Sequence, residues 1–236
     1  MKLPTLVRSK HGAEYDEEFM SVMTSVYEQQ TPHTKMRMRN VAELVEPGPG
    51  ERVLDLGCAT GAMTHYLSTF GCVAVGADAS PVGVEEAQRL HPELRFEVAD
   101  AADLPFEDAS FDKVLAADLT EHLELETLQA MFRECARVLV PGGTLSIHTP
   151  NPKHVIERLK DHGVLIEQNP SHIGLRTSEE LTDELRAAGF EIDLDVKRRS
   201  FIPVFRTLEL VGAPLTELLR YRVCIRARKP VPTASA

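Results

Sequence analysis

The sequence predicts an α/β protein whose parallel sheet carries helices on both faces. Two observations lead to this prediction. From residue 52 onward, short apolar runs alternate with amphipathic segments of helical length. Strands that are separated by helices pair in parallel, because each connection must cross back over the sheet. The chain has 236 residues, of which 43% are hydrophobic and 26% charged, which is enough for one domain with a buried core.

The first part of the chain, residues 14–46, is expected to be helical. Apolar residues recur there at helical spacing and indicate two helices. A break at Thr31-Pro32-His33 separates them, and the second helix is expected over Lys35–Val45. The run Glu46-Pro47-Gly48-Pro49-Gly50 then ends it, since proline and glycine both interrupt helices.

Five parallel strands are then expected in order, separated by helices. The predicted strands are Arg52–Leu56, Val73–Ala77, Leu94–Val98, Lys113–Ala117 and Thr144–Thr149. A helix over Ala62–Phe70 follows the first strand. Another begins at Pro81, with Ser80 as its N-cap. A third places its apolar side chains from residue 128 to residue 139 on one face.

The last third of the chain is predicted to add one helix and two strands. Thr177 and Glu180 have the spacing of a capping box, and Gly189 is expected to end the helix that starts there. Glu191–Val196 and Tyr221–Ala227 alternate like strands, and a helical insert is expected between them at Val204–Leu219.

The first strand runs into a glycine-containing loop that predicts a cofactor site. Gly57 and Gly61 let the backbone turn sharply and lie against a ligand, because no Cβ stands in the way. Asp78 follows the second strand, 21 residues after Gly57. A carboxylate at that spacing is suited to accept hydrogen bonds from both hydroxyls of a ribose. The cofactor is therefore expected to contain a nucleoside.

The same loop argues against a dinucleotide. A dinucleotide fingerprint that starts at Gly57 needs glycine at positions 59 and 62, where this chain has Ala59 and Ala62. Acids also stand at or near four predicted strand ends: Asp55, Asp78, Asp100 and Asp118. They disfavour a pyrophosphate and favour a cation. S-adenosylmethionine has a sulfonium, an ammonium and no phosphate, and its one carboxylate can lie at the helix N-terminus after Gly61.

Four segments in order resemble the class I S-adenosylmethionine-dependent methyltransferases. They are VLDLGCATG, GADAS, ADAADLPFEDASFD and VLVPGGTL, and the resemblance covers about residues 52–189. It is greatest with the small-molecule branch that includes the ubiquinone and menaquinone biosynthesis enzymes. The resemblance implies a Rossmann-like sheet of seven strands, mostly parallel with one antiparallel strand. It also implies an N-terminal helical lid at residues 1–46 and a methyltransferase domain at 47–230. The remaining tail at 231–236 is expected to be disordered.

The resemblance assigns a role to each residue of the expected cofactor site. Asp55 and the Gly57–Gly61 loop, with Cys58 and Ala59, would hold the methionine part. Asp78 would bind the ribose, and Ala79 would lie beside the adenine. Asp100 would accept from the adenine amino group, with Ala101 as a backbone contact, and Asp118 would border the sulfonium. Cys58 is expected to fill space, since no basic residue flanks it to activate the thiol.

His122 is the candidate catalytic base. It follows the fourth predicted strand, where methyl and acceptor should meet, and a histidine is suited to remove a proton from a hydroxyl at neutral pH. A solvent-facing or packed His122 is the alternative. A second alternative is a divalent metal on Glu121, His122 and His172, because Asp118-x-x-Glu121-His122 resembles the metal motif of some O-methyltransferases. Asp118 is one methylene shorter than the usual glutamate, which favours the base without a metal.

Composition and charge limit the other functions. The net charge of −10 argues against a nucleic-acid-binding surface. From Lys197 onward, however, nine basic and two acidic residues form a basic edge. This edge is interpreted as a strand face that pairs with the acidic body, or as a docking surface for an anionic acceptor or a membrane. His148 is a further candidate for the site, whereas His154 and His162 are expected to be solvated.

We expect an enzyme without a secretory signal or membrane span, since every apolar stretch long enough to cross a membrane is interrupted by charged residues or proline. The four cysteines form no CxxC pair, and we expect buried free thiols in a cytoplasmic protein. The predicted function is methylation of a small molecule, at a hydroxyl oxygen in preference to carbon or nitrogen. A protein that binds the cofactor without transferring a methyl group is the alternative of another class. The acceptor and the oligomeric state stay open.

Overall fold

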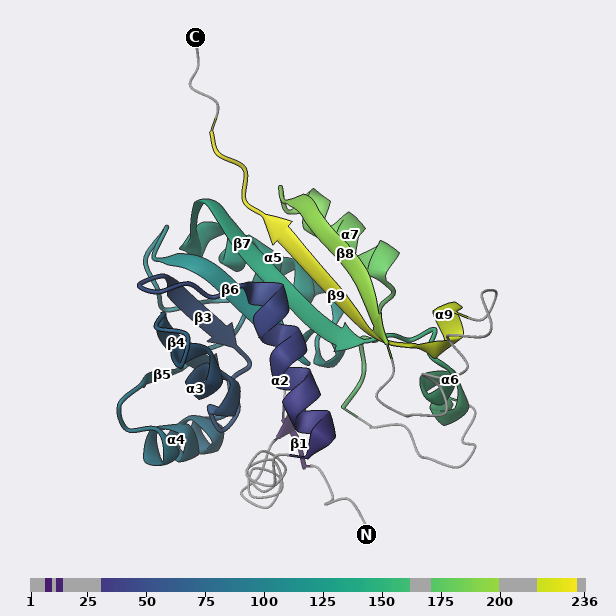
Figure 1. The fold of residues 1–236 in the computed structure, drawn as a ribbon, viewed down its shortest axis with the longest axis horizontal. Helices are drawn as coiled ribbons and strands as arrows, with labels where there is room; N and C mark the ends of the chain where they lie inside the picture. The colour runs from purple at the N-terminus through teal and green to yellow at the C-terminus, as the bar shows by residue number, and fades with distance from the viewer. Residues whose placement is uncertain (1–6, 10–11, 15–30, 162–170, 200–215, 233–236) are drawn as a thin grey trace.

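The computed structural model describes residues 7–9, 12–14, 31–161, 171–199 and 216–232. Its main sheet has seven strands in the order β5-β4-β3-β6-β7-β9-β8 (Figure 1). The strands are β3 (Arg52–Leu56), β4 (Val73–Asp78), β5 (Arg95–Val98), β6 (Phe111–Ala117), β7 (Leu139–Pro150), β8 (Glu191–Arg199) and β9 (Arg220–Arg228). The strands from β5 to β7 pair in parallel, and β9 runs antiparallel to both its neighbours. The predicted sheet, with one antiparallel strand, is confirmed.

Helices cover both faces of this sheet (Figure 1). On one face α2 (Pro32–Val45) and α3 (Ala62–Ser68) pack their apolar side chains against β3, β4 and β6. On the other face α5 (Leu125–Val138) and α7 (Ser178–Ala187) bury the larger core cluster, which includes Phe132 and Leu181. Because successive strand residues point to opposite faces, β3, β4 and β6 contribute side chains to both clusters. The fold is thus three layers with the sheet in the middle.

Shorter elements complete the described chain. The helix α4 (Pro81–Leu90) packs against β4 and β5 and buries Ala87 beside Phe96. A 3-10 turn, η1 (Thr120–His122), follows β6, and α6 (Val155–Asp161) follows β7. The helix α9 (Thr216–Leu219) leads into β9. Near the N-terminus, β1 (Val7–Ser9) and β2 (Gly12–Glu14) form a separate antiparallel pair.

Local sequence signals place the helix ends as predicted. The Ser80 side chain accepts a hydrogen bond from the backbone N–H of Gly83, and Pro81 stands in the first turn. Thr177 and Glu180 form the predicted capping box. Each cap satisfies helix N–H groups that have no partner within the helix, so these boundaries depend on nearby residues alone.

Several boundaries differ from the prediction, among them the starts of α2 and β7. The helix α2 starts at Pro32 and not at Lys35, because Thr31 is its N-cap and proline is compatible with the first turn. The strand β7 starts at Leu139 and not at Thr144, so it includes Pro141-Gly142-Gly143, and its pairing with β6 shifts register there. The predicted helix before Thr31 and most of the insert at 204–219 lie outside the described residues. A lid over residues 1–46 stays a prediction, although the end of α2 packs in the core through Val41 and Val45.

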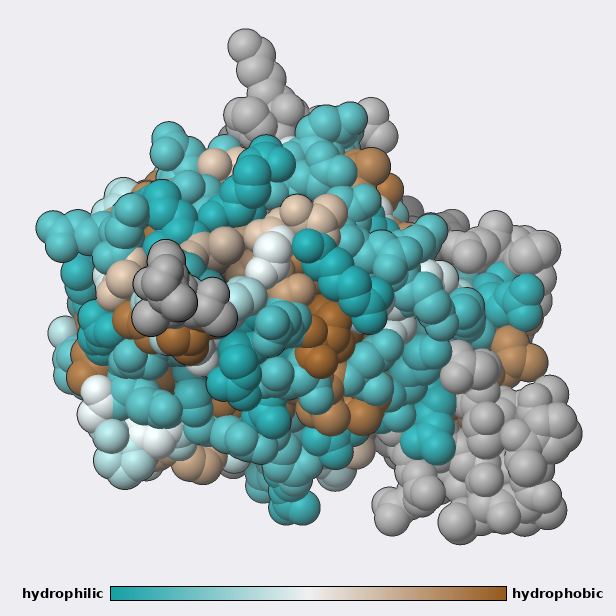
Figure 2. All heavy atoms as spheres, turned by 90° about the horizontal axis from the view of Figure 1, so that it is seen from above, coloured by the Kyte–Doolittle hydropathy of each residue, from teal (hydrophilic) through white to brown (hydrophobic). Residues whose placement is uncertain are grey.

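The basic edge pairs largely with acids of the same chain. Arg226 of β9 lies 2.8 Å from Glu46, and Arg228 pairs with Asp193. On β8, Arg198 lies 3.2 Å from Glu43. Seen from the end where the C-terminal tail leaves, the surface is mostly hydrophilic, with hydrophobic residues only in small groups (Figure 2). These contacts favour the interpretation of a strand face that pairs with the acidic body.

Within the part of the chain that the structure describes, no helix combines the length and the apolar character that a membrane span requires. The four cysteines are all free and buried.

Candidate active site

The glycine loop lies at the carboxyl end of β3, between the strand and α3. Gly57 and Gly61 both have φ 79°, which is the left-handed region that glycine adopts without strain. At Gly61 a Cβ would lie 2.7 Å from the Phe96 ring, so the close approach of α3 to β5 also requires glycine. Ala59 has φ 48° although it is not a glycine. Its backbone is therefore strained by roughly 1–2 kcal/mol.

Asp78 lies at the end of β4, opposite this loop, and two backbone amides hold its carboxylate. Oδ2 accepts from the N–H of Ala59 at 2.8 Å, and Oδ1 accepts from the N–H of Ser80 at 2.8 Å. Each oxygen keeps a second lone pair, so the carboxylate can still accept from two hydroxyl groups. Burial raises the pKa of Asp78, while the two amides favour the ionised form. Asp78 is therefore well placed for the predicted role at a ribose.

Asp55 and Cys58, of the predicted methionine site, are both buried. Asp55 is 2% exposed, and its Oδ2 accepts from the Thr64 hydroxyl at 2.7 Å. Burial raises the pKa of Asp55 to about 6. This carboxyl group ties the first turns of α3 to β3 and thereby fixes the loop between them. Cys58 packs with Ala87 and Phe96, and burial raises the pKa of its thiol. The thiol therefore stays protonated, which agrees with the expectation that Cys58 fills space.

Asp100 and Ala101 follow β5 along the same edge of the sheet. Asp100 is exposed, and its Oδ1 accepts from the N–H of Ala102 at 2.9 Å. Ala101 is buried, whereas Ala79, beside Asp78, is exposed. The backbone N–H of Ala99 donates to the Asp78 carbonyl, which holds the two strand ends together. The predicted adenine residues are thus adjacent to the predicted ribose residue.

Asp118, at the end of β6, lies between two arginines. Its Oδ2 accepts from Arg37 Nε at 2.7 Å, and its Oδ1 accepts from Arg222 Nη1 at 2.8 Å. Burial opposes its charge, but Arg222 and Arg37 outweigh burial and hold the pKa of Asp118 well below its usual range. Its backbone has φ 54°. Asp118 thus joins α2 to β9, a partnership that the sequence did not reveal because the arginines are 81 and 104 residues away.

The three candidate metal ligands lie together beyond β6. One ligand atom each from Glu121, His122 and His172 lies within 4.8 Å of the other two. Glu121 is 1% exposed and accepts from the Thr149 hydroxyl at 2.9 Å. Burial, and then the charge of Asp118, raises the pKa of Glu121 to about 8. The rings of His122 and His172 meet edge to face, with their centroids 5.0 Å apart.

His122 has the tautomer that a base requires. Its Nδ1 lies 3.0 Å from the carbonyl oxygen of Ser171, so Nδ1 carries the proton and donates it to that oxygen. The lone pair is then on Nε2. Burial lowers the pKa of His122, which keeps the ring neutral at neutral pH. The charge of Asp78 also acts on this ring, which places His122 near the predicted ribose carboxylate.

Two other histidines are buried in this region. His148 is 1% exposed, with Nδ1 3.8 Å from Asp118, and burial lowers its pKa to about 3. The expectation that His154 is solvated is wrong, because it is fully buried and its ring meets Tyr221 edge to face. Its position after Pro152 looked polar in sequence, and the contact comes from β9, 67 residues later. His162 lies outside the described residues.

The residues at this edge fit S-adenosylmethionine. The loop at Gly57 keeps its left-handed turn against Leu119, where a Cβ would come within 3.2 Å. The carboxylate of Asp78, which accepts from two backbone amides, lies opposite this loop. The acids at this edge of the sheet suit a cation. The family model for a methyltransferase domain matches residues 53–143, which include the glycine loop, Asp78 and His122. The chain is 32% identical over 191 residues to O-methyltransferase resE of Aspergillus sclerotiorum, covering 75% of this chain and 69% of that protein.

The chain belongs to the S-adenosylmethionine-dependent methyltransferases. The methyltransferase is also 32% identical over 196 residues to 24-methylenesterol C-methyltransferase 2 of Oryza sativa, with 75% of this chain and 52% of that protein covered. It therefore spans about half the length of this second relative. A solved geranyl diphosphate methyltransferase in complex with S-adenosylmethionine shares the fold, with a TM-score of 0.65, 18% identity and 91% of each chain covered.

Proposed function

We propose that the methyltransferase transfers a methyl group to a hydroxyl oxygen of a small organic acceptor, and that His122 removes the hydroxyl proton. The observation that carries this proposal is the hydrogen bond from His122 Nδ1 to the Ser171 carbonyl. It leaves the lone pair of a neutral ring on Nε2, at the carboxyl edge of the sheet. A positioned base of this kind contributes roughly 100- to 10,000-fold to a rate that needs proton removal.

The chain's own residues divide the work. When bound, S-adenosylmethionine supplies a methyl group on a positively charged sulfur, which is a good leaving group. Asp78 and the glycine loop hold and orient the nucleoside and methionine parts. His122 receives the acceptor proton at Nε2, and the carbonyl of Ser171 stabilises the imidazolium that forms through the Nδ1–H bond.

The presence of a base favours oxygen as the acceptor atom. An amine acceptor is nucleophilic as the neutral amine and can react without a base, whereas a hydroxyl needs its proton removed in the transition state. The similarity to an O-methyltransferase supports oxygen, and the similarity to a sterol C-methyltransferase supports carbon as the alternative. An aromatic hydroxyl suits a histidine best, because its pKa is close enough for proton transfer.

A divalent metal on Glu121, His122 and His172 is the second candidate mechanism. The observation that favours it is that their ligand atoms all lie within 4.8 Å of one another. Two imidazoles and a carboxylate are ligands that zinc or manganese accepts, and a metal would orient the acceptor oxygen. The two arginines that flank Asp118 keep this carboxylate from acting as a fourth ligand.

One experiment separates these mechanisms. The chain is incubated with S-adenosylmethionine and a panel of phenols, alcohols, amines and carbon acids, and S-adenosylhomocysteine is measured. The proposal predicts turnover with phenols, full activity after treatment with EDTA, and a much larger loss for His122→Ala than for Glu121→Gln. Turnover confined to amines or carbon acids would contradict oxygen transfer. Loss with EDTA and recovery with Mn²⁺ or Zn²⁺ would establish the metal mechanism.

A further inference from the structure

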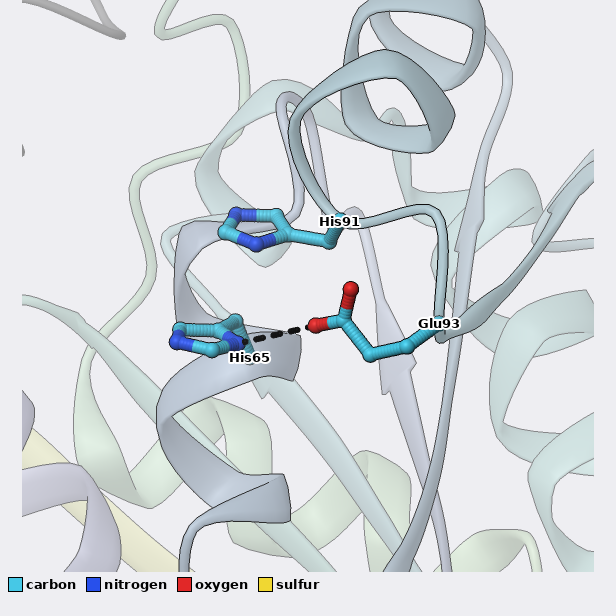
Figure 3. A group of neighbouring side chains, drawn as sticks. All are labelled: His65, His91 and Glu93. Carbon is cyan, nitrogen blue, oxygen red and sulfur yellow. Dashed lines mark ion pairs between the residues drawn. The ribbon is translucent and has the colours of Figure 1, made fainter.

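A second group of metal-ligating side chains lies outside the site described above. His65 comes from the middle of α3, whereas His91 and Glu93 come from the connection between α4 and β5 (Figure 3). The side chains of His65 and Glu93 are 48% and 58% exposed. One ligand atom of each residue lies within 4.8 Å of the other two. No step of methyl transfer uses these residues.

One distance in the group matches that between two ligands of a tetrahedral zinc site. Nδ1 of His65 and Oε1 of Glu93 are 3.4 Å apart, as the dashed line in Figure 3 marks. Two ligands that each bind zinc at 2.0–2.2 Å with tetrahedral geometry are separated by roughly 3.4 Å. The two imidazole rings are stacked, with centroids 4.4 Å apart and 11° between their planes. Binding of one ion by both stacked rings therefore requires the His91 ring to rotate.

We propose that His65, His91 and Glu93 bind one zinc ion, with water as the fourth ligand. Two imidazoles and one carboxylate are a donor set that suits zinc and disfavours magnesium and calcium, which prefer oxygen ligands.

Zinc at this position would join two elements that carry the cofactor loops. The helix α3 begins directly after Gly61, and the connection that holds His91 and Glu93 ends α4, which begins after Asp78 and Ser80. A ligand that binds only the folded chain stabilises it by mass action. The zinc ion is thus a structural link between the helices that follow the two loops, and not a participant in catalysis.

Calorimetric titration with zinc chloride at about pH 8, where histidine is neutral, tests this site. The titration uses the His122→Ala chain, in which the cluster at the carboxyl edge has lost a ligand. One zinc per chain is expected. Adding His65→Ala or Glu93→Gln removes a zinc ligand and should weaken zinc binding by more than about 100-fold. Loss of a residue that only hydrogen-bonds to a ligand costs roughly 10- to 100-fold. Adding Glu85→Gln, an exposed carboxylate on α4, should leave the affinity unchanged.

A second measurement follows the unfolding temperature. Zinc at about a hundred times its dissociation constant should raise it by roughly 5–10 °C in the His122→Ala chain, and by much less once His65→Ala is added. Magnesium should raise it in neither chain. Equal zinc affinity with and without His65→Ala and Glu93→Gln would overturn the proposal, as would the absence of zinc binding at millimolar concentrations.

Discussion

Ala59 is the residue at which the cofactor loop stores backbone strain. Its φ of 48° suits glycine, and the alanine Cβ costs roughly 1–2 kcal/mol there. Ala59→Gly removes that strain but adds freedom to the unfolded chain. We expect the free energy of unfolding to rise by about 0.5–1 kcal/mol, measured by urea denaturation. The same substitution at Ala130, in the regular helix α5, should lower it by about 1 kcal/mol. If both variants lose stability equally, the loop at Ala59 is not strained.

Asp78 is the residue on which we expect cofactor affinity to depend most. Asp78→Asn removes the charge and one acceptor oxygen, so it should weaken S-adenosylmethionine binding by about 10- to 100-fold, given roughly 1.5–3 kcal/mol for a charge-assisted hydrogen bond. Calorimetry measures this directly. Glu97→Gln, on the neighbouring strand β5, is the control and should bind normally. An unchanged affinity of the Asp78→Asn chain would show that the ribose binds elsewhere.

Glu121 makes stability depend on pH. Burial raises its pKa from 4.5 to about 8, so the folded chain holds this proton more tightly than the unfolded chain. The resulting stability is fully present below about pH 4.5 and is lost as pH rises through about 8. Glu121→Gln stays neutral, so its unfolding temperature should fall less than that of the wild type between these pH values. The exposed Glu126→Gln should follow the wild type. Parallel curves for all three chains would show that Glu121 is ionised in the fold.

At the scale of elements, the pair Arg37–Asp118 fixes the start of α2 to the end of β6. Both arginines of this group are 13% exposed and Asp118 is 25% exposed, so the charges are only partly screened. A double-mutant cycle with Arg37→Gln and Asp118→Asn should give a coupling energy of about 1–3 kcal/mol in urea denaturation. Arg39→Gln, two residues further along α2 and exposed, should change stability by less than about 0.5 kcal/mol. Additive effects of the first two substitutions would contradict a direct link.

Elements were predictable where their ends depend on neighbouring residues. Ser80 with Pro81, and Thr177 with Glu180, set helix starts through contacts within one turn. Thr31 with Pro32 carries the same kind of signal, and it was interpreted as a break because a proline can end one helix or begin the next. The start of β7 depends on its pairing with β6 and was therefore not visible in its own sequence.

At the scale of the whole molecule, the parallel sheet brings distant strand ends to one edge. The glycine loop, Asp78, Asp100 and His122 were predictable as neighbours, because the carboxyl ends of parallel strands meet there. Charge pairing across the molecule was not predictable. Arg222 reaches Asp118 from β9, which returns antiparallel from the far end of the chain.

The pH dependence of methyl transfer by the wild type and His122→Ala, with the best phenol acceptor, tests the central claim most directly. The wild-type rate should rise to a plateau below about pH 7, since burial lowers the pKa of His122 from 6.5. His122→Ala should lose about a hundredfold or more at neutral pH and keep its affinity for S-adenosylmethionine. Its loss should shrink as the pH approaches about 10, where the phenol ionises unaided. A His122→Ala chain with wild-type activity at neutral pH would contradict the role of this histidine as the base.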